Sequence, residues 1–273
     1  MPDLRTNGGC LHYEDYEAVS PGGAPVVLLH GLGSCGDDWP LQVQALTDRR
    51  RVLTLDLPGH GRSTPLPGRV RIADFAAAVL RLLEVRREPA VHLVGLSLGG
   101  AVALQLAADA PQRVLSLTAV NTFARLRPAE HGLGRGLTRL RLLLFAPMDR
   151  VGEWVALGLF PREDQAGLRR LAAQRLTSNR RRTYLRSIAA VLRFDLRARL
   201  GEIVCPTLVV AGDRDRTVPL AAKLEIQAGI RGARFQIVGD SGHATPLDAP
   251  QAFNTLLLGF LDEVEGIDAR SRE

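Results

Sequence analysis

The chain has 273 residues, of which 46% are hydrophobic and 23% are charged, as in soluble globular proteins that bury a large core. No apolar run is long enough to cross a bilayer, and residues 1–7 lack the apolar segment of a signal peptide, so we expect a cytoplasmic protein without a membrane span. The three cysteines, Cys10, Cys35 and Cys205, show no metal-ligand spacing, which favours a reducing compartment and no metal site.

The net charge of +6 is unevenly distributed along the chain. Residues 121–200 contain 17 of the 35 basic residues and 6 of the 29 acidic ones, which gives this segment a net charge of +11. Lys223 is the only lysine, so almost all of the positive charge is guanidinium. Such a segment is typical of arginine-rich helix faces in solvent, and it also suits an anionic substrate or an acidic partner. No groove-reading motif accompanies the charge, so we do not expect nucleic acid as a partner.

The first part of the chain alternates predicted strands with predicted helices. Apolar and β-branched runs predict strands at residues 10–19, 26–30, 51–56 and 114–120, and a further strand that begins at residue 91. Helical spacing of apolar residues predicts a helix over 72–86, and other helices are expected to start near residues 37–39 and to span 101–108. This alternation predicts an α/β fold with a mostly parallel central sheet and right-handed crossovers.

The alternation stops between residues 121 and 200. This segment predicts helices at 133–145, 151–160, 164–176 and 180–193, which are most simply a helical lid over the carboxyl edge of the sheet. Strands at 206–211 and 233–238 then resume, with a helix from residue 220 and a closing helix over 250–265. We therefore expect a core domain of residues 1–120 and 201–265, a lid of residues 121–200, and a disordered tail of residues 266–273.

A Gly-x-Ser-x-Gly motif, formed by Gly95, Ser97 and Gly99, lies where the strand from residue 91 meets the next helix. A strand that turns directly into a helix strains the backbone of its corner residue, so the flanking positions must lack bulk. The serine hydroxyl then lies at the sheet edge, at the positive end of a helix.

Two other polar residues follow predicted buried strands, Asp215 and His243. The carboxyl ends of parallel strands meet at one edge of a sheet, so both side chains can converge with Ser97. A serine needs a neighbouring base to become nucleophilic, and a carboxylate fixes the tautomer of that base. Asp213 follows the same strand as Asp215 and is the alternative acid.

The order of these motifs resembles the α/β-hydrolase family over about residues 26–261. The resemblance depends on residues 30–33 (His-Gly-Leu-Gly), residues 56–63 (Asp-Leu-Pro-Gly-His-Gly-Arg-Ser), residues 95–100, residues 212–219 and residues 241–243. It implies Ser97 as nucleophile, His243 as base and Asp215, four residues before Pro219, as the orienting acid. The backbone N–H groups of Leu32 and Leu98 would form the oxyanion hole, and no cofactor is expected.

Other candidate residues have competing structural explanations. His30 and His60 are more consistent with braces of the family turns than with bases, and Cys35 with a small buried thiol than with a second nucleophile. A substrate pocket is assigned to Trp39, Phe123 and Trp154, although core packing explains these aromatic residues equally well.

The resemblance is strongest to small bacterial esterases, enol-lactonases and carbon–carbon bond hydrolases. We therefore expect a serine hydrolase that cleaves a small carboxylic ester, thioester or lactone through an acyl-serine intermediate. One alternative is a carbon–carbon bond hydrolase acting on an anionic diketone-like or dienoic acid, which the basic segment would suit. Others are a ligand receptor that retains the triad, and a thioesterase whose basic lid docks an acidic carrier protein. The sequence does not indicate an oligomeric state.

Overall fold

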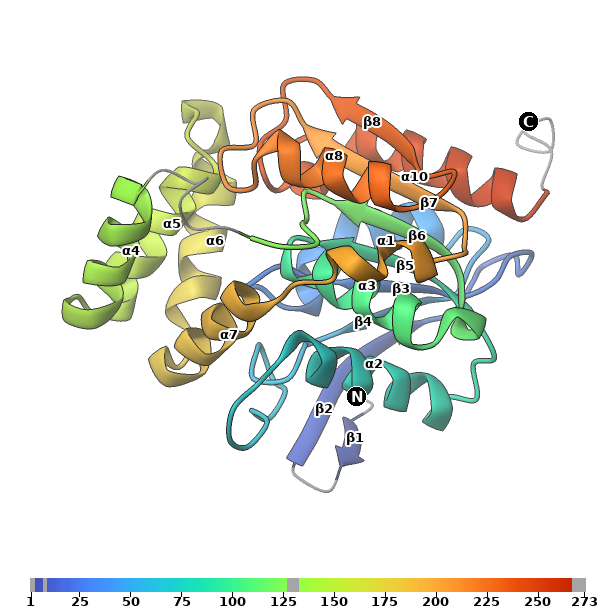
Figure 1. The fold of residues 1–273 in the computed structure, drawn as a ribbon, viewed down its shortest axis with the longest axis horizontal. Coiled ribbons are helices and arrows are strands. Elements are labelled where there is room, and N and C mark those ends of the chain that lie inside the picture. The colour runs from blue at the N-terminus through green and yellow to red at the C-terminus, as the bar shows by residue number, and fades with distance from the viewer. Residues whose placement is uncertain (1–2, 7–8, 127–132, 267–273) are drawn as a thin grey trace.

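The computed structural model describes residues 3–6, 9–126 and 133–266. Eight strands form one sheet in the order β1-β2-β4-β3-β5-β6-β7-β8 (Figure 1). Their bounds are β1 Asp3–Thr6, β2 Gly9–Tyr16, β3 Val26–Leu29, β4 Val52–Leu55, β5 Val91–Leu96, β6 Val114–Val120, β7 Thr207–Gly212 and β8 Arg234–Val238. Strands β1 and β2 pair antiparallel at one edge, and the remaining strands are parallel, which confirms the predicted mostly parallel sheet.

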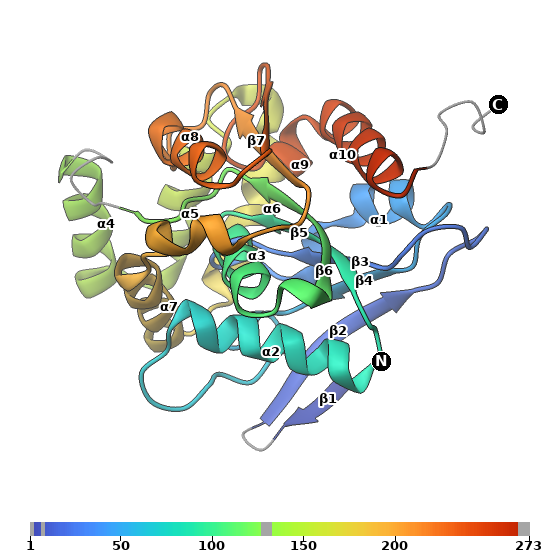
Figure 2. The same cartoon turned by 45° about the vertical axis from the view of Figure 1, so that its right-hand side comes forward.

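Helices cover both faces of this sheet (Figure 2). Helices α2 (Ile72–Val85), α3 (Leu98–Asp109) and α8 (Leu220–Gly229) pack on one apolar cluster, while α1 (Pro40–Leu46) and α10 (Pro250–Val264) pack on another. Because the central strands are buried on both faces, they are continuous apolar runs, as in the four fully buried residues of β3.

A helical insertion joins β6 to β7 and extends to one side of the sheet (Figure 1). It comprises α4 (Leu133–Phe145), α5 (Met148–Leu159), α6 (Ala166–Thr177) and α7 (Arg181–Arg193). The four helices are predicted correctly, although α5 begins at Met148 because Pro147 occupies its N-cap. Part of the expected lid, residues 127–132, and all but the first residue of the expected tail lie outside the described residues.

The sequence does not predict some short elements. These are β1, helix α9 (Thr245–Asp248) and the 3₁₀ segments η1 (Gly36–Asp38), η2 (Pro111–Arg113), η4 (Glu163–Gln165) and η5 (Arg197–Glu202). Strand β2 ends at Tyr16, three residues earlier than expected. None of the described helices combines the length and the hydropathy that a membrane span requires.

Candidate active site

Ser97 lies at the junction of β5 and α3, with φ 54° and ψ −113°. Positive φ is strained for a residue with a side chain, and the flanking glycines leave room for it. A Cβ on Gly95 would lie 2.4 Å from the carbonyl oxygen of Gly99, and one on Gly99 would lie 2.1 Å from that of Leu29. The close approach of α3 to β5 and β3 therefore requires glycine at both positions.

The end of β6 connects Ser97 to the loop that carries His243. The Ser97 N–H donates to the carbonyl oxygen of Val120 at 2.9 Å, and the Thr122 hydroxyl donates to the Ser97 carbonyl oxygen at 2.6 Å. The side-chain amide of the adjacent residue, Asn121, donates to the carbonyl oxygen of His243 at 2.8 Å. Two consecutive residues after one strand thus hold the backbones of Ser97 and His243.

Asn121 also holds the last residue of β7, after which the loop with Asp215 begins. Its Oδ1 accepts a hydrogen bond of 2.9 Å from the Gly212 N–H, and its side chain is fully buried. Its φ of 44° lies in the left-handed region, which asparagine tolerates better than most residues. This residue was not predicted from the sequence, although a polar residue at the carboxyl end of a buried strand is the same signal that singled out Asp215.

His243 contacts Asp215, and both side chains are buried. Its Nδ1 lies 3.0 Å from Oδ2 and 3.1 Å from Oδ1 of the carboxylate. Oδ1 also accepts hydrogen bonds from the N–H groups of Thr217 (2.7 Å) and Val218 (3.2 Å). An ionised carboxylate only accepts hydrogen bonds, so this contact assigns the proton to Nδ1 and leaves Nε2 available as a base.

The alternative acid, Asp213, has a different contact. Its carboxylate accepts a hydrogen bond of 3.0 Å from the N–H of Ser241, in the loop that precedes His243. Between the two candidates, the structure brings the carboxylate of Asp215 to the imidazole.

Lys223 is a further neighbour of Asp215 that the sequence did not predict. Its Nζ lies 2.7 Å from Oδ2 of Asp215, and the lysine and aspartate side chains are 1% and 0% exposed. Burial favours a neutral carboxyl group, but the charges and hydrogen bonds of His243 and Lys223 outweigh it and hold the pKa of Asp215 well below its usual range. Burial lowers the pKa of Lys223, and Asp215 opposes that shift.

The loop after β3 passes beside Ser97. A Cβ placed on Gly31 would lie 3.7 Å from the Cβ of Ser97, and Leu32 follows Gly31 directly. Leu98 is the first residue of α3, and N–H groups in the first turn of a helix have no partner within the helix. That the N–H groups of Leu32 and Leu98 form an oxyanion hole stays a prediction.

His30 braces this loop rather than projecting from it. Its Nδ1–H donates to the carbonyl oxygen of Gly31 at 2.8 Å, and its Nε2 accepts from the Leu57 N–H at 2.9 Å. Both ring nitrogens are therefore occupied in the neutral form, and burial lowers the pKa of His30. His60 packs against it with ring centroids 5.2 Å apart, and burial lowers the pKa of His60 to about 3.

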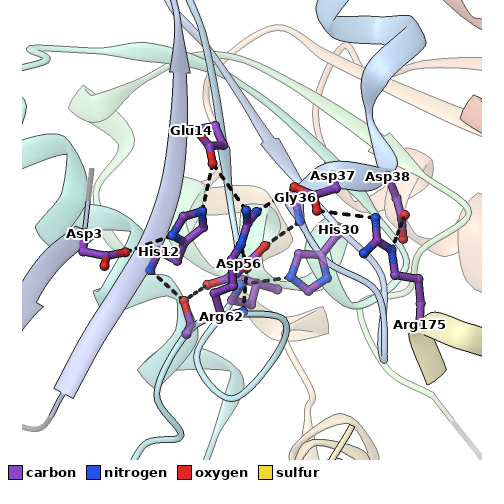
Figure 3. A network of polar contacts seen from close by, with 12 residues as sticks. Asp3, His12, Glu14, His30, Gly36, Asp37, Asp38, Asp56, Arg62 and Arg175 are labelled. Atoms are coloured by element: carbon purple, nitrogen blue, oxygen red, sulfur yellow. Dashed lines mark hydrogen bonds and ion pairs between the residues drawn. The ribbon is translucent and has the colours of Figure 1, made fainter. Parts of the chain in front are cut away.

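Asp56 holds the part of the loop after β3 that contains η1, as Figure 3 shows. Its carboxylate accepts hydrogen bonds from the N–H groups of Gly36 (2.7 Å) and Arg62 (2.8 Å). The Arg62 side chain reaches from Asp56 to Asp37, with 2.6 Å between its Nη2 and the Asp37 carboxylate. These contacts hold η1 against the turn that follows β4.

The helical insertion is tied to the same loop. Arg175, near the end of α6, donates to Asp38 at 3.1 Å, as Figure 3 shows. The amide of Asn179 donates to the carbonyl oxygen of Gly33 at 2.9 Å. The insertion therefore contacts the loop that carries Leu32.

The predicted pocket residues lie in different surroundings. Trp39, 2% exposed, belongs to the apolar cluster under α1 and α10, and Phe123 packs edge-to-face on Phe194 with ring centroids 6.3 Å apart. Trp154 is half-buried on α5. That they line a substrate pocket stays a prediction.

Burial raises the pKa of the Cys35 thiol to about 12, which disfavours a nucleophilic thiolate.

Within the described part of the chain, no group of three or more His, Cys, Asp and Glu side chains is placed to hold a metal ion.

Comparisons with known proteins give one consistent result. Residues 24–250 match a protein-family model described as alpha/beta hydrolase fold. The chain is 34% identical over 271 residues to a protein of Azorhizobium caulinodans named carbamate hydrolase RutD, with 97% of this chain and 100% of that protein covered. Among solved structures, an enol-lactonase from Burkholderia xenovorans LB400 matches with a TM-score of 0.87 and 26% identity, covering 95% of this chain and 99% of the lactonase. A thermophilic esterase from Thermogutta terrifontis matches with a TM-score of 0.80 and 25% identity, covering 96% and 98%.

Proposed function

The chain belongs to the α/β-hydrolase family, and on that premise we propose that it is a serine hydrolase that cleaves a small carboxylic ester, thioester or lactone. The observation that carries this proposal is the double anchor at the end of β6. Thr122 binds the backbone of Ser97 and Asn121 binds that of His243, so the strained serine and the Asp215-bound imidazole are held by neighbouring residues.

In the proposed mechanism, His243 Nε2 takes the proton of the Ser97 hydroxyl as its oxygen attacks the substrate carbonyl carbon. The negative charge on the carbonyl oxygen is stabilised by the N–H groups of Leu32 and Leu98. His243 then gives its proton to the leaving group, which leaves an acyl group on Ser97. A water molecule, deprotonated by His243, attacks this acyl group and releases the acid. Asp215 keeps the imidazole oriented throughout.

The ester and lactone substrates are supported by the similarity to an esterase and an enol-lactonase over nearly the whole chain. A carbamate is the second candidate, favoured by the more similar relative that is named a carbamate hydrolase. Attack by Ser97 on the carbonyl carbon of a carbamate would use the same base and the same N–H donors as attack on an ester. Kinetics on p-nitrophenyl acetate, a small lactone and a phenyl carbamate separate the two: we expect kcat/KM to be higher for the ester and lactone, and a clear preference for the carbamate would replace the first proposal by the second.

The nucleophile is tested with Ser97→Ala. We expect kcat on p-nitrophenyl acetate to fall by about 10³-fold or more, as when other hydrolases lose their nucleophile. Ser178→Ala is the matched control and should retain wild-type turnover, because this serine hydroxyl donates to the carbonyl oxygen of Arg175 within the insertion. Near wild-type turnover by Ser97→Ala would reject the proposal. A single burst without sustained turnover in the wild-type protein would favour a receptor instead.

A further inference from the structure

A hollow of about 550 Å³ lies between α7 and the segment that precedes α2, and none of Ser97, Asp215 and His243 lines it. One wall is formed by Arg69 and Val70, and the other by residues of α7. Its positively charged lining residues are Arg69, Arg181, Arg182, Arg186 and Arg193. Its remaining lining residues are Val70, Leu185 and Ala189. We call these three residues the apolar floor and the five arginines the rim arginines.

The rim arginines differ from many of the other arginines that the structure describes. Arg50, Arg51 and Arg199, for example, each pair with two or more carboxylates. None of the five rim arginines contacts a carboxylate within the described residues. Guanidinium groups held around one hollow repel each other, and a bound anion would offset that repulsion.

Two of the rim arginines are held in place by backbone contacts. Arg181 donates to the carbonyl oxygen of Ala146, and Arg186 donates to those of Leu66 (2.6 Å) and Gly68. The second contact ties α7 to the opposite wall of the hollow. The guanidinium groups of Arg69, Arg182 and Arg193, which are exposed, have no such contact among the described residues and are available to a ligand.

We propose that this hollow binds a nucleotide with two or more phosphates. Planar guanidinium groups bind phosphate oxygens in a bidentate manner, and several of them match more than one phosphate. The apolar floor suits the flat face of a base, because it buries ring surface without leaving polar groups unpaired. The volume lies in the range of small-molecule sites, whereas a protein partner needs a contact of about 800 Å² on each side, far beyond this lining.

Such a nucleotide can come from two sources, a free nucleoside diphosphate or the nucleotide end of a thioester carrier. ADP represents the first source and coenzyme A the second. Coenzyme A would connect the hollow to a thioester substrate, and that branch rests on the proposed function. Binding is measured without turnover, so its failure and the failure of the hydrolase proposal are separate results.

The test is isothermal titration of the full-length protein with ADP, coenzyme A and pyrophosphate. We expect ADP or coenzyme A to bind with 1:1 stoichiometry, and pyrophosphate to bind more weakly because it cannot contact the floor. The double variant Arg182→Gln/Arg193→Gln should bind at least about tenfold more weakly, since each hydrogen bond to a charged group contributes on that scale. The control Arg150→Gln/Arg170→Gln removes equal charge from exposed positions on α5 and α6 and should bind like the wild type.

Three results would overturn the inference. The first is no binding of ADP or coenzyme A at millimolar concentration. The second is an equal loss of affinity in the two double variants, which would show attraction to the overall charge rather than a site. The third is pyrophosphate binding as tightly as ADP, which would show that the apolar floor does not contribute to nucleotide binding.

Discussion

Replacing Lys223 by methionine should move the acid limb of the pH profile of hydrolysis, because it removes a positive charge beside the carboxylate of Asp215. In the native site, the carboxylate of Asp215 faces two basic groups, with Lys223 Nζ 2.7 Å and His243 Nδ1 3.0 Å from the same oxygen. Protonation of His243 therefore adds a second positive charge beside a carboxylate that is already paired. A methionine at this position would keep most of the length of the side chain and remove its charge. The imidazolium of His243 would then be the one cationic group that these contacts place beside the carboxylate of Asp215.

The size of the expected displacement of the acid limb follows from these distances. Both basic groups contact one carboxylate oxygen, so the two positive charges lie within about 6 Å of each other, and at an effective dielectric constant of about 20 they repel by about 3 kcal/mol. One pH unit corresponds to about 1.4 kcal/mol, so loss of the lysine charge should raise the acid limb of the pH profile by about one to two units. Asp215 keeps its hydrogen bonds from Thr217 and Val218, so the plateau of kcat/KM should fall much less than in Ser97→Ala.

The assay is kcat/KM on p-nitrophenyl acetate from pH 5 to 9, for the wild type, Lys223→Met and Lys223→Gln. Glutamine can still donate a hydrogen bond to Asp215 but carries no charge, so both variants should share the upward shift. A lysine that only supports the fold would lower the plateau and leave the acid limb where it is. An unchanged acid limb in both variants would refute the electrostatic reasoning.

Three further predictions concern the buried polar groups and the tight glycine. Burial raises the pKa of Glu265, but hydrogen bonds from His92, Ala24 and Arg50 outweigh burial and lower this pKa to about 2. The ionised carboxylate therefore stabilises the fold fully above pH ~4.5, and this stabilisation disappears as the pH falls towards 2. Glu265→Gln should therefore lose about 2 kcal/mol of unfolding free energy at pH 7, after allowance for solvent screening, and little at pH 2 in urea titrations; an equal loss at both pH values would contradict the assignment. Asn121→Ala should lower kcat by about tenfold or more while the chain stays folded by circular dichroism, because the loops carrying Asp215 and His243 lose a shared anchor; unchanged kcat would show that the anchor is dispensable. Gly99→Ala should destabilise the protein by about 3 kcal/mol or more, since its Cβ would collide with the backbone of Leu29, whereas Gly259→Ala, in open space on α10, should stabilise it by up to about 1 kcal/mol; thermal unfolding that ranks the two alike would count against the packing described at Ser97.

The larger elements could be predicted because their patterns are local. The largely apolar segments 26–29, 91–96 and 114–120 form strands of the sheet, and helices form between residues 133 and 193, where the spacing of apolar residues predicts them. Strand β1 could not be predicted, because Asp3–Thr6 has a single apolar residue and forms a strand only by pairing with β2. Helix α9 is too short for helical periodicity to be visible.

Candidate site residues could be named from the sequence where a motif fixes their position, and not where a long-range contact brings a residue in; the roles of the named residues stay predictions. Ser97, Asp215 and His243 each follow a strand in a motif of fixed spacing. Lys223 belongs to α8, where Leu220 and Leu224 are exposed and the lysine is 1% exposed, the reverse of the usual pattern. Its burial depends on the carboxylate of Asp215, which helical periodicity does not encode.

The hollow beside α7 illustrates the same limit. The excess of arginine between residues 121 and 200 is visible in the sequence. That Arg69 joins Arg182 and Arg193 around one hollow depends on the packing of α7 against the segment before α2. Composition alone could not distinguish this arrangement from a solvated helix face.

The most direct test of a reactive serine is labelling with a fluorophosphonate, followed by mass spectrometry of the peptides. Such a probe reacts with a serine that a neighbouring base activates, and it requires no knowledge of the substrate. A single adduct on Ser97, greatly reduced in His243→Ala, is the expected result. An adduct on another residue, or none on Ser97 in an otherwise folded protein, would contradict the assignment of Ser97 as a nucleophile activated by His243.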